Sequence, residues 1–302
     1  MKKRILALGL TVALAAASLA ACGGASTKTT EKATEAAAEQ GSEKATEAAK
    51  EEKADSGELR TYKLGVNGSD HEEWEKANEL LQKDNIKLEM VEFSDYVKPN
   101  EALEDGEIDL NAFQTEIYFN NFVKERGYTD LGVLAYTQVA PMGIYSSKYK
   151  SLDEATGHLI IAIPNDVTNG GRALKFLEKN GFLTLKKEAG LTPTVMDIEK
   201  YNKDVEIVEM VATQIPASLP DLSFACINNG VAKDAGLTLK NDAIVYEDYK
   251  EPDMKNYWNI IAAKKDRIES EDFQKIKKAY NSDEVKQVVL EHYDGQSIPV
   301  WD

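Results

Sequence analysis

The stretch Ile160–Lys179, IIAIPNDVTNGGRALKFLEK, combines residue types that could bind an anion. An apolar run meets Pro164, a short segment of small and amide residues follows with Gly170 and Gly171, and Arg172 opens a helical pattern. Free backbone N–H groups and the positive end of the helix dipole meet at such strand-to-helix junctions. Glycines let a ligand approach the backbone, and an arginine fork fits a carboxylate or phosphate. We therefore predict an anion site here, with an ordinary βα turn and a surface arginine as the alternative.

The first residues predict a lipoprotein signal peptide, residues 1–21. Basic residues at positions 2–4 precede the run Ile5–Ala20, which is shorter than the ~20 residues that a membrane-spanning helix needs. The sequence Leu19-Ala20-Ala21-Cys22 resembles a bacterial lipobox. We expect cleavage before Cys22 and attachment of lipid to it, so that the protein is held on the extracytoplasmic face of the cell membrane. A plain secretory signal is the alternative.

Charge and composition limit the rest of the chain. The formal net charge is −16, and removal of residues 1–21 takes away three basic residues and no acid, which gives 33 − 52 = −19. Such a surface would be repelled by phosphate backbones, so we expect no nucleic-acid partner. Residues 22–58 contain an Ala/Glu/Lys/Thr repeat without large apolar residues, and we interpret them as a low-complexity tether. Cys226 is the other cysteine after Cys22, and we expect it to be a small buried apolar residue.

From Leu59 to Asp302, strand-like runs alternate with helical patterns, which predicts α/β sheets covered by helices on both faces. Ser69 and Glu72 fit a capping box that opens a helix through Asp84, and Ser270–Tyr293 predicts two amphipathic helices. Predicted strands are Tyr62–Asn67, Ile86–Phe93, Glu107–Phe113, Pro141–Ser147, Leu159–Pro164, Val205–Met210, Leu222–Asn228, Ala243–Asp248 and Trp258–Lys265. Ligands of such sheets bind at the carboxyl ends of the strands, where the Arg172 segment lies.

Five segments in order resemble the NlpA/MetQ family of methionine-binding lipoproteins, the substrate-binding components of methionine ABC importers. They are Phe93–Leu103, Gly106–Gln114, Ile163–Leu174, Leu191–Ile198 and Tyr257–Ala263. The resemblance implies a two-lobed fold like that of periplasmic binding proteins, with the ligand in the cleft between lobes joined by two crossover strands. It places the first lobe at 59–148 plus 256–302 and the second at 149–255. It also implies L-methionine as ligand, the importer membrane subunits as partners, a monomer, and no metal or cofactor.

The resemblance carries over to individual residues. Arg172 matches the arginine that pairs with the substrate carboxylate, Asn169 lies beside it, and Asn228 and Asn259 match polar contacts to the amino acid. Tyr96, Phe113 and Tyr118 match the aromatic residues around the methionine side chain, although core packing would also explain aromatic residues there. Thr115 departs from the family pattern, which often has a histidine at this position, and the proline that often follows is replaced by Ile117.

Other functions remain as alternatives. An enzyme would need a catalytic motif, but no nucleophile elbow, P-loop, zinc-binding helix motif or cysteine-pair metal motif occurs. Of the three histidines, His71, His158 and His292, the first is at a predicted helix start and the second precedes a predicted strand, which favours local structural roles for both. A surface interaction protein would also suit the tether. Other ligands would be D-methionine, a methionine-containing dipeptide or another apolar amino acid.

Overall fold

The computed structural model describes residues 57–301. The predicted signal peptide, Cys22 and nearly all of the predicted tether therefore lie outside the described residues. Within residues 57–301, a helix with the length and apolar composition for crossing a bilayer is absent.

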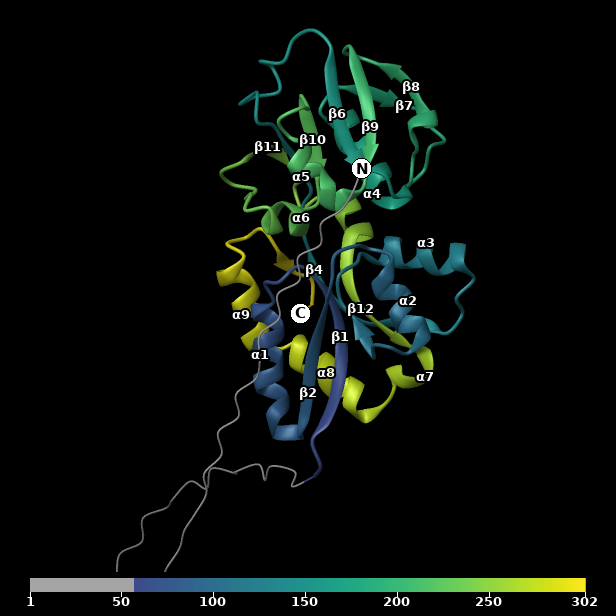
Figure 1. Cartoon of the computed structure of the whole chain (residues 1–302), viewed down its shortest axis with the longest axis vertical. Coiled ribbons are helices and arrows are strands. Elements are labelled where there is room, and N and C mark those ends of the chain that lie inside the picture. Colours follow the sequence, from purple (N-terminus) through teal and green to yellow (C-terminus); the bar gives the residue numbers. More distant parts are fainter. Residues whose placement is uncertain (1–56, 302) are drawn as a thin grey trace, which may run out of the picture. The chain divides into compact units, whose positions relative to one another are not determined.

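A six-stranded mixed sheet, which we call the first sheet, draws strands from both ends of the described chain (Figure 1). Its order is β13-β4-β12-β3-β1-β2; β1 is parallel to β2 and β3, whereas β12 is antiparallel to β3 and β4. The strands are β1 (Arg60–Asn67), β2 (Ile86–Phe93), β3 (Leu110–Asn111), β4 (Leu131–Val139), β12 (Trp258–Lys264) and β13 (Ile298–Pro299). The predicted strand Glu107–Phe113 is thus reduced to two residues.

Helices cover both faces of the first sheet. Because side chains alternate along a strand, Ile261 of β12 packs in one cluster with α1, α8 and α9, and Ile260 packs in another with α2 and α3. These helices are α1 (Glu72–Leu81), α2 (Lys98–Asp105), α3 (Glu116–Arg126), α8 (Glu271–Tyr280) and α9 (Asp283–His292), with the short α7 (Lys265–Ile268) and 3₁₀ turns η1 (Gln82–Asp84) and η4 (Pro252–Tyr257) between elements. The two predicted C-terminal helices are confirmed as α8 and α9.

The predicted capping box at the start of α1 is wrong. The helix begins at Glu72 with His71 as the N-cap residue, and no side chain caps it. Gly68 has a left-handed backbone with φ 78°, and the His71 ring bonds to the Gly68 carbonyl oxygen at 2.8 Å. The chain thus turns at Gly68, and Ser69 lies two residues before the N-cap position, so it does not cap the helix.

A five-stranded sheet, the second sheet, has the order β11-β5-β10-β6-β9. Strands β9, β6 and β10 are parallel, and β5 is antiparallel to β10 and β11. The elements of this half are β5 (Gly143–Tyr145), β6 (Leu159–Pro164), α4 (Val167–Lys179), η2 (Val195–Asp197), β9 (Val205–Met210), η3 (Ala212–Gln214), α5 (Ile215–Ser218), β10 (Phe224–Ile227), α6 (Asn229–Asp234) and β11 (Ala243–Tyr246), with a small hairpin of β7 (Leu183–Leu185) and β8 (Ile198–Tyr201).

Helix α4 packs with one face of the second sheet, and α5 and α6 pack with the other. Cys226 lies in the α4 cluster with no exposed surface, which confirms the prediction of a small buried residue. Burial in apolar surroundings also raises the pKa of its thiol.

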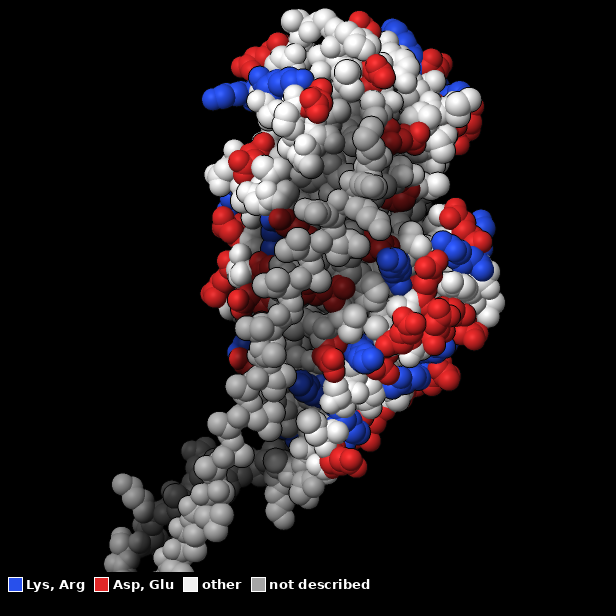
Figure 2. Space-filling view, in the orientation of Figure 1, with Lys and Arg blue, Asp and Glu red and all other residues white. Residues whose placement is uncertain are grey.

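The chain passes between the two sheets twice, through residues 140–142 and 247–257, which we call the two crossings. β5 lies in the second sheet, although the predicted lobe boundary after Lys148 assigns it to the first lobe. The division into lobes at 148/149 and 255/256 stays a prediction. Acidic side chains are spread widely over the visible face in Figure 2, in keeping with the net charge of −16.

Candidate ligand-binding cleft

Helix α4 begins at Val167, so Gly170, Gly171 and Arg172 lie inside the helix rather than in a loop before it. The N-cap residue is Asp166, whose Oδ1 accepts the backbone N–H of Asn169 at 2.8 Å. A carboxylate of this chain thus occupies the N-terminus of the helix and accepts one of its free N–H groups. The helix terminus is therefore not available to a ligand anion, contrary to the prediction.

The two glycines serve packing. A Cβ on Gly170 would lie 2.7 Å from the carbonyl oxygen of Pro164, and one on Gly171 would lie 2.9 Å from Cα of Thr192. Neither glycine lines the cavity described below. The prediction that they let a ligand approach the backbone is wrong, because they let α4 lie against the end of β6 and the segment around Thr192.

Two asparagines meet where neighbouring parallel strands end. Asn169 is in the first turn of α4, which follows β6, and Asn228 directly follows β10. Because β6 and β10 are parallel neighbours, their carboxyl ends lie at the same edge of the second sheet. Asn228 Nδ2 accordingly donates a hydrogen bond to Asn169 Oδ1 at 2.7 Å.

This pair presents an acceptor to the cleft. Asn169 Nδ2 donates to both oxygens of Asp166, at 3.1 and 3.0 Å, and a carboxylate can only accept. That contact fixes the orientation of the Asn169 amide and, through it, that of Asn228. Asn228 Oδ1 is left buried without a hydrogen-bond partner among residues 57–301. A buried acceptor of this kind calls for a donor, such as the ammonium group of a ligand.

Arg172 is buried and already bonded. Its Nε lies 3.0 and 3.1 Å from the two carboxylate oxygens of Glu247, and its Nη2 bonds to Glu247 Oε2 and, at 2.9 Å, to the carbonyl oxygen of Ala140. The guanidinium carbon lies 4.3 Å from the ring centre of Tyr257. Burial raises the pKa of Tyr257 to about 12, so its hydroxyl is neutral near pH 7. The Nε edge of the predicted fork is therefore occupied by Glu247, and Nη1 is the nitrogen that neither Glu247 nor Ala140 contacts.

Three aromatic rings come together on the side of the first sheet. Tyr96 follows β2, Phe113 follows β3, and Tyr118 is in the first turn of α3. Their ring centres are 6.0 to 6.3 Å apart, and the Tyr118 hydroxyl donates to the Tyr96 carbonyl oxygen at 2.9 Å. Burial raises the pKa of both tyrosines, so their hydroxyl groups stay neutral. The three rings form an uncharged aromatic wall.

Thr115, at the departure from the family pattern, is the N-cap of α3. Its Oγ1 accepts the backbone N–H of Tyr118 at 3.3 Å, which leaves its hydroxyl proton to be donated elsewhere. An isolated antiparallel bridge joins Thr115 to Asn259, at the start of β12. Thr115 thus both caps α3 and lines the cavity described below.

A cavity of about 630 Å³ connects these groups. All eight residues predicted to bind ligand line it: Tyr96, Phe113, Thr115, Tyr118, Asn169, Arg172, Asn228 and Asn259. Arg172, Asn169 and Asn228, which come from the second-sheet half, form what we call the head-group end. Tyr96, Phe113 and Tyr118, from the first-sheet half, form the aromatic end.

Contacts between the two halves also occur at the cavity wall. Lys233 of α6 lies 2.8 Å from Asp70 Oδ2 and 4.0 Å from the ring centre of Tyr293, both in the first-sheet half. Burial raises the pKa of Asp70, but hydrogen bonds from Lys233 and His292 outweigh burial and hold it below its usual range. The two halves are therefore also joined by a charged contact that does not involve the predicted ligand residues.

The sequence reasoning missed Asp166, Glu247 and Tyr257. Asp166 could have been found as an N-cap residue just before the α4 pattern. Glu247 has no local signal, since it is 75 residues from Arg172. Among the described residues, no group of three or more His, Cys, Asp or Glu side chains could hold a metal ion.

Comparisons with known proteins agree with this geometry. The family model of the NlpA lipoproteins matches residues 62–301. The D-methionine-binding lipoprotein MetQ of Escherichia coli is 40% identical over 243 residues, which are 79% of this chain and 88% of that protein.

Two solved structures are similar throughout the described part of the chain. A nutrient-binding protein from Burkholderia cenocepacia bound to methionine has a TM-score of 0.75 and 35% identity, covering 80% of this chain and 100% of that one. The substrate-binding protein of a methionine transporter from Streptococcus pneumoniae has a TM-score of 0.75 and 38% identity, covering 80% of this chain and 96% of that one. The fold is therefore that of the two-lobed periplasmic substrate-binding proteins, and the chain belongs to the NlpA lipoprotein family.

Proposed function

We propose that this protein captures L-methionine outside the cytoplasm and delivers it to the membrane subunits of an ABC importer. One observation carries the proposal: a single cavity offers a buried arginine, an orphaned amide acceptor and an aromatic wall. An α-amino acid needs a cation for its carboxylate and neutral acceptors for its ammonium group. A thioether is favoured beside aromatic rings.

In this proposal the ligand carboxylate meets Arg172 Nη1, the ammonium group meets Asn228 Oδ1, and the side chain lies against Tyr96, Phe113 and Tyr118. Asn169 orients Asn228, and Asn259 contributes a further polar contact. The similarity to methionine-binding relatives supports this assignment.

The identity of the ligand is tested by native mass spectrometry of freshly purified protein, followed by competitive calorimetry with L-methionine, D-methionine, leucine and glycyl-methionine. D-Methionine is a specific rival because relatives are named for it, and the dipeptide is a rival because a cavity of about 630 Å³ is ample for a drug-sized ligand. We expect L-methionine to bind best. A tenfold preference for leucine or the dipeptide would contradict the methionine assignment and leave the amino-acid-binding fold intact.

Methionine sulfoxide tests the aromatic end. Its added S=O dipole would be buried with few donors, at a cost of roughly 1–3 kcal/mol or about five- to more than a hundredfold in affinity. The Thr115 hydroxyl is one donor at the cavity wall, and the small volume of threonine leaves room for an ordered water or a longer ligand. If the sulfoxide equals methionine in wild type but not in Thr115→His, the threonine hydroxyl is the donor and the slot is less apolar than proposed.

We further propose that the protein is a monomer anchored by lipid on Cys22. A single acyl chain gives only marginal anchoring, so stable retention needs more than one. Cys22→Ala should move the protein from the membrane fraction to a precursor or soluble form. Wild-type protein with an intact bond between residues 21 and 22 and no lipid would contradict this. Binding without turnover is part of the proposal; conversion of a bound ligand by the pure protein would favour an enzyme instead.

A further inference from the structure

Glu247 occupies an unusual position beside the head-group end. Its carboxylate accepts the Nε–H of Arg172 and, through Oε2, the backbone N–H of Met142 at 2.7 Å. Its own backbone N–H donates to the Met142 carbonyl oxygen at 3.0 Å. Since Met142 belongs to the first crossing and Glu247 begins the second, this one carboxylate ties the two crossings together.

Arg172 completes the same cluster. It donates to the carbonyl oxygen of Ala140 in the first crossing and lies against the ring of Tyr257 at the end of the second. The side chains of Arg172 and Glu247 are only 4% and 10% exposed. The two opposite charges lie within hydrogen-bond distance of each other, so their effects on the cleft largely offset each other.

The remaining charge near the head-group end is negative. Asp166 accepts a hydrogen bond from Asn169, and Asn169 accepts one from Asn228. This chain of bonds leaves Asn228 Oδ1 as a buried acceptor. Asp234 of α6 lines the same cavity, and Asp166 caps the helix whose Asn169 and Arg172 line it. Because Glu247 balances the charge of Arg172, the negative charge of Asp166 remains. A ligand that has only a carboxylate adds a second unbalanced negative charge, whereas the ammonium group of a zwitterion offsets the ligand's own carboxylate.

We infer that Glu247 determines specificity: by cancelling the charge of Arg172, it makes the cleft select zwitterionic amino acids over carboxylic acids of the same shape without an ammonium group. The inference rests on the proposed function and adds the charge class of the ligand to it. Glu247 also acts as a positioning residue, because it holds the Nε edge of the guanidinium and leaves Nη1 for the ligand.

The test compares methionine with 4-(methylthio)butanoate, which has the same carbon chain and thioether but no ammonium group. Dissociation constants for both are measured by calorimetry on wild type, Glu247→Gln, Glu247→Asp and Glu251→Gln. Glu251 is a matched control because it is four residues away and pairs at the surface with Lys179 instead of Arg172.

Wild type should prefer methionine by about a hundredfold or more, since the analogue loses a charge-assisted hydrogen bond and meets repulsion. Glu247→Gln should lower that preference by about tenfold or more, because it uncovers the positive charge of Arg172. Glu247→Asp keeps the charge and should keep most of the preference, and Glu251→Gln should keep all of it.

The inference would be overturned if the preference of Glu247→Gln for methionine over the analogue stays within about threefold of the wild-type preference. It would also be overturned if Glu251→Gln loses as much of this preference as Glu247→Gln does. In either case methionine still binds, and the proposed function stands. Equal binding of the two compounds to wild type would overturn it even if Glu247→Gln fails to fold. A wild-type protein that binds no methionine would overturn both the proposed function and this inference.

Discussion

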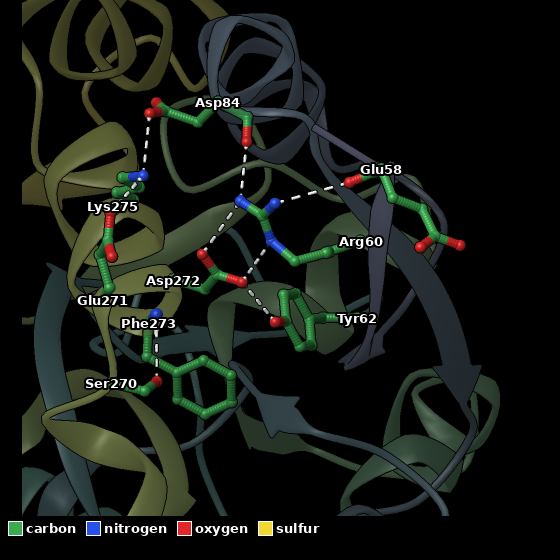
Figure 3. A network of polar contacts seen from close by, with 9 residues as sticks. All are labelled: Glu58, Arg60, Tyr62, Asp84, Ser270, Glu271, Asp272, Phe273 and Lys275. Carbon is green, nitrogen blue, oxygen red and sulfur yellow. Dashed lines mark hydrogen bonds and ion pairs between the residues drawn. The ribbon is translucent and has the colours of Figure 1, made fainter. Parts of the chain in front are cut away.

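Two arginine–carboxylate pairs in this molecule use the same chemistry in different surroundings. Arg60 donates to Asp272 through Nε at 2.7 Å and Nη2 at 3.2 Å, and to the carbonyl oxygen of Asp84 at 2.9 Å (Figure 3). Tyr62 adds a bond to the same carboxylate, and the network joins the start of β1 to the first turn of α8. Arg172 instead lines the cleft, and Glu247, which lies behind the cavity wall in the second crossing, pairs with it.

Burial separates the two pairs. The side chains of Arg60 and Asp272 are 34% and 16% exposed, against 4% and 10% for Arg172 and Glu247. Water screens the first pair and can replace a lost partner, whereas the second leaves a desolvated charge when broken. Similar hydrogen-bond chemistry therefore does not mean equal importance, and of the two arginines it is Arg172 that lines the cavity.

Arg172→Ala should have the largest effect. Loss of one partner of a buried, hydrogen-bonded charge pair costs ~2–5 kcal/mol in binding, or on the order of 30-fold to several thousand-fold in methionine affinity. Unfolding should also become easier by about 3–5 kcal/mol, because Glu247 stays buried and unpaired. Calorimetry and denaturant unfolding measure the two effects.

Arg172→Lys should recover only part of both losses, since a point charge cannot replace the planar group that contacts Glu247, Ala140 and the Tyr257 ring. Near-native methionine affinity in the folded alanine variant would refute the assignment of Arg172 to the ligand.

Asp272→Asn should lower the free energy of unfolding by about 1–2 kcal/mol, because it weakens bonds from Arg60 and Tyr62 that are partly exposed. Methionine affinity should stay unchanged, since neither Asp272 nor Arg60 lines the cavity. A large loss of affinity in this variant would show that the two pairs are coupled.

The pH dependence of the free energy of unfolding tests the contribution of the Arg60–Asp272 pair. Burial raises the pKa of Asp272, but hydrogen bonds from Arg60 and Tyr62 outweigh it and lower the pKa overall. A carboxyl pKa that is lowered by folding stabilises the fold above the unfolded value of about 3.9, and this contribution is lost as the pH falls through the folded pKa. The stability difference between wild type and Asp272→Asn should therefore shrink below about pH 4. Denaturant unfolding from pH 7 to pH 3 would show this, and a constant difference would contradict it.

The smallest effect is expected at the surface pair of Lys179 and Glu251, whose side chains are 53% and 44% exposed. Glu251→Gln should change the free energy of unfolding by no more than ~0.5 kcal/mol and leave methionine binding as it is. Thermal unfolding measures this change. A larger change would mean that side-chain exposure does not predict how much an ion pair contributes to stability.

The sequence located one partner of the important pair but not the other. Arg172 follows the predicted strand Leu159–Pro164 and lies in the segment Ile163–Leu174 that resembles the family, so a local pattern predicted it. Glu247 reaches it only through the pairing of β11 with β5 and of β5 with β10, which no local pattern encodes. The two glycines before Arg172 were misinterpreted for a similar reason: the atoms that require them, in Pro164 and Thr192, become neighbours only when α4 packs.

The elements that position the two ends of the cavity were also predicted unevenly. Strands β1, β2, β6, β9 and β10 are short apolar or alternating runs, and the sequence predicts them closely. Helix α3 was not singled out because Ile117, Tyr118 and Phe119 are consecutive, so the apolar residues of the helix do not form a single stripe. Strand β4 was missed as well, although it lies between β13 and β12 and leads into the first crossing.

The placement of the head-group end and the aromatic end on different halves of the molecule has a kinetic consequence. If the cleft opens, Arg172, Asn169 and Asn228 stay together with the second sheet, and the rings of Tyr96, Phe113 and Tyr118 leave with the first. An arriving amino acid would then be held first by its backbone groups, which all amino acids share, and its side chain would be compared with the rings only on closing. Stopped-flow association rates for methionine and leucine should accordingly be alike, and their dissociation rates should carry nearly all of the discrimination.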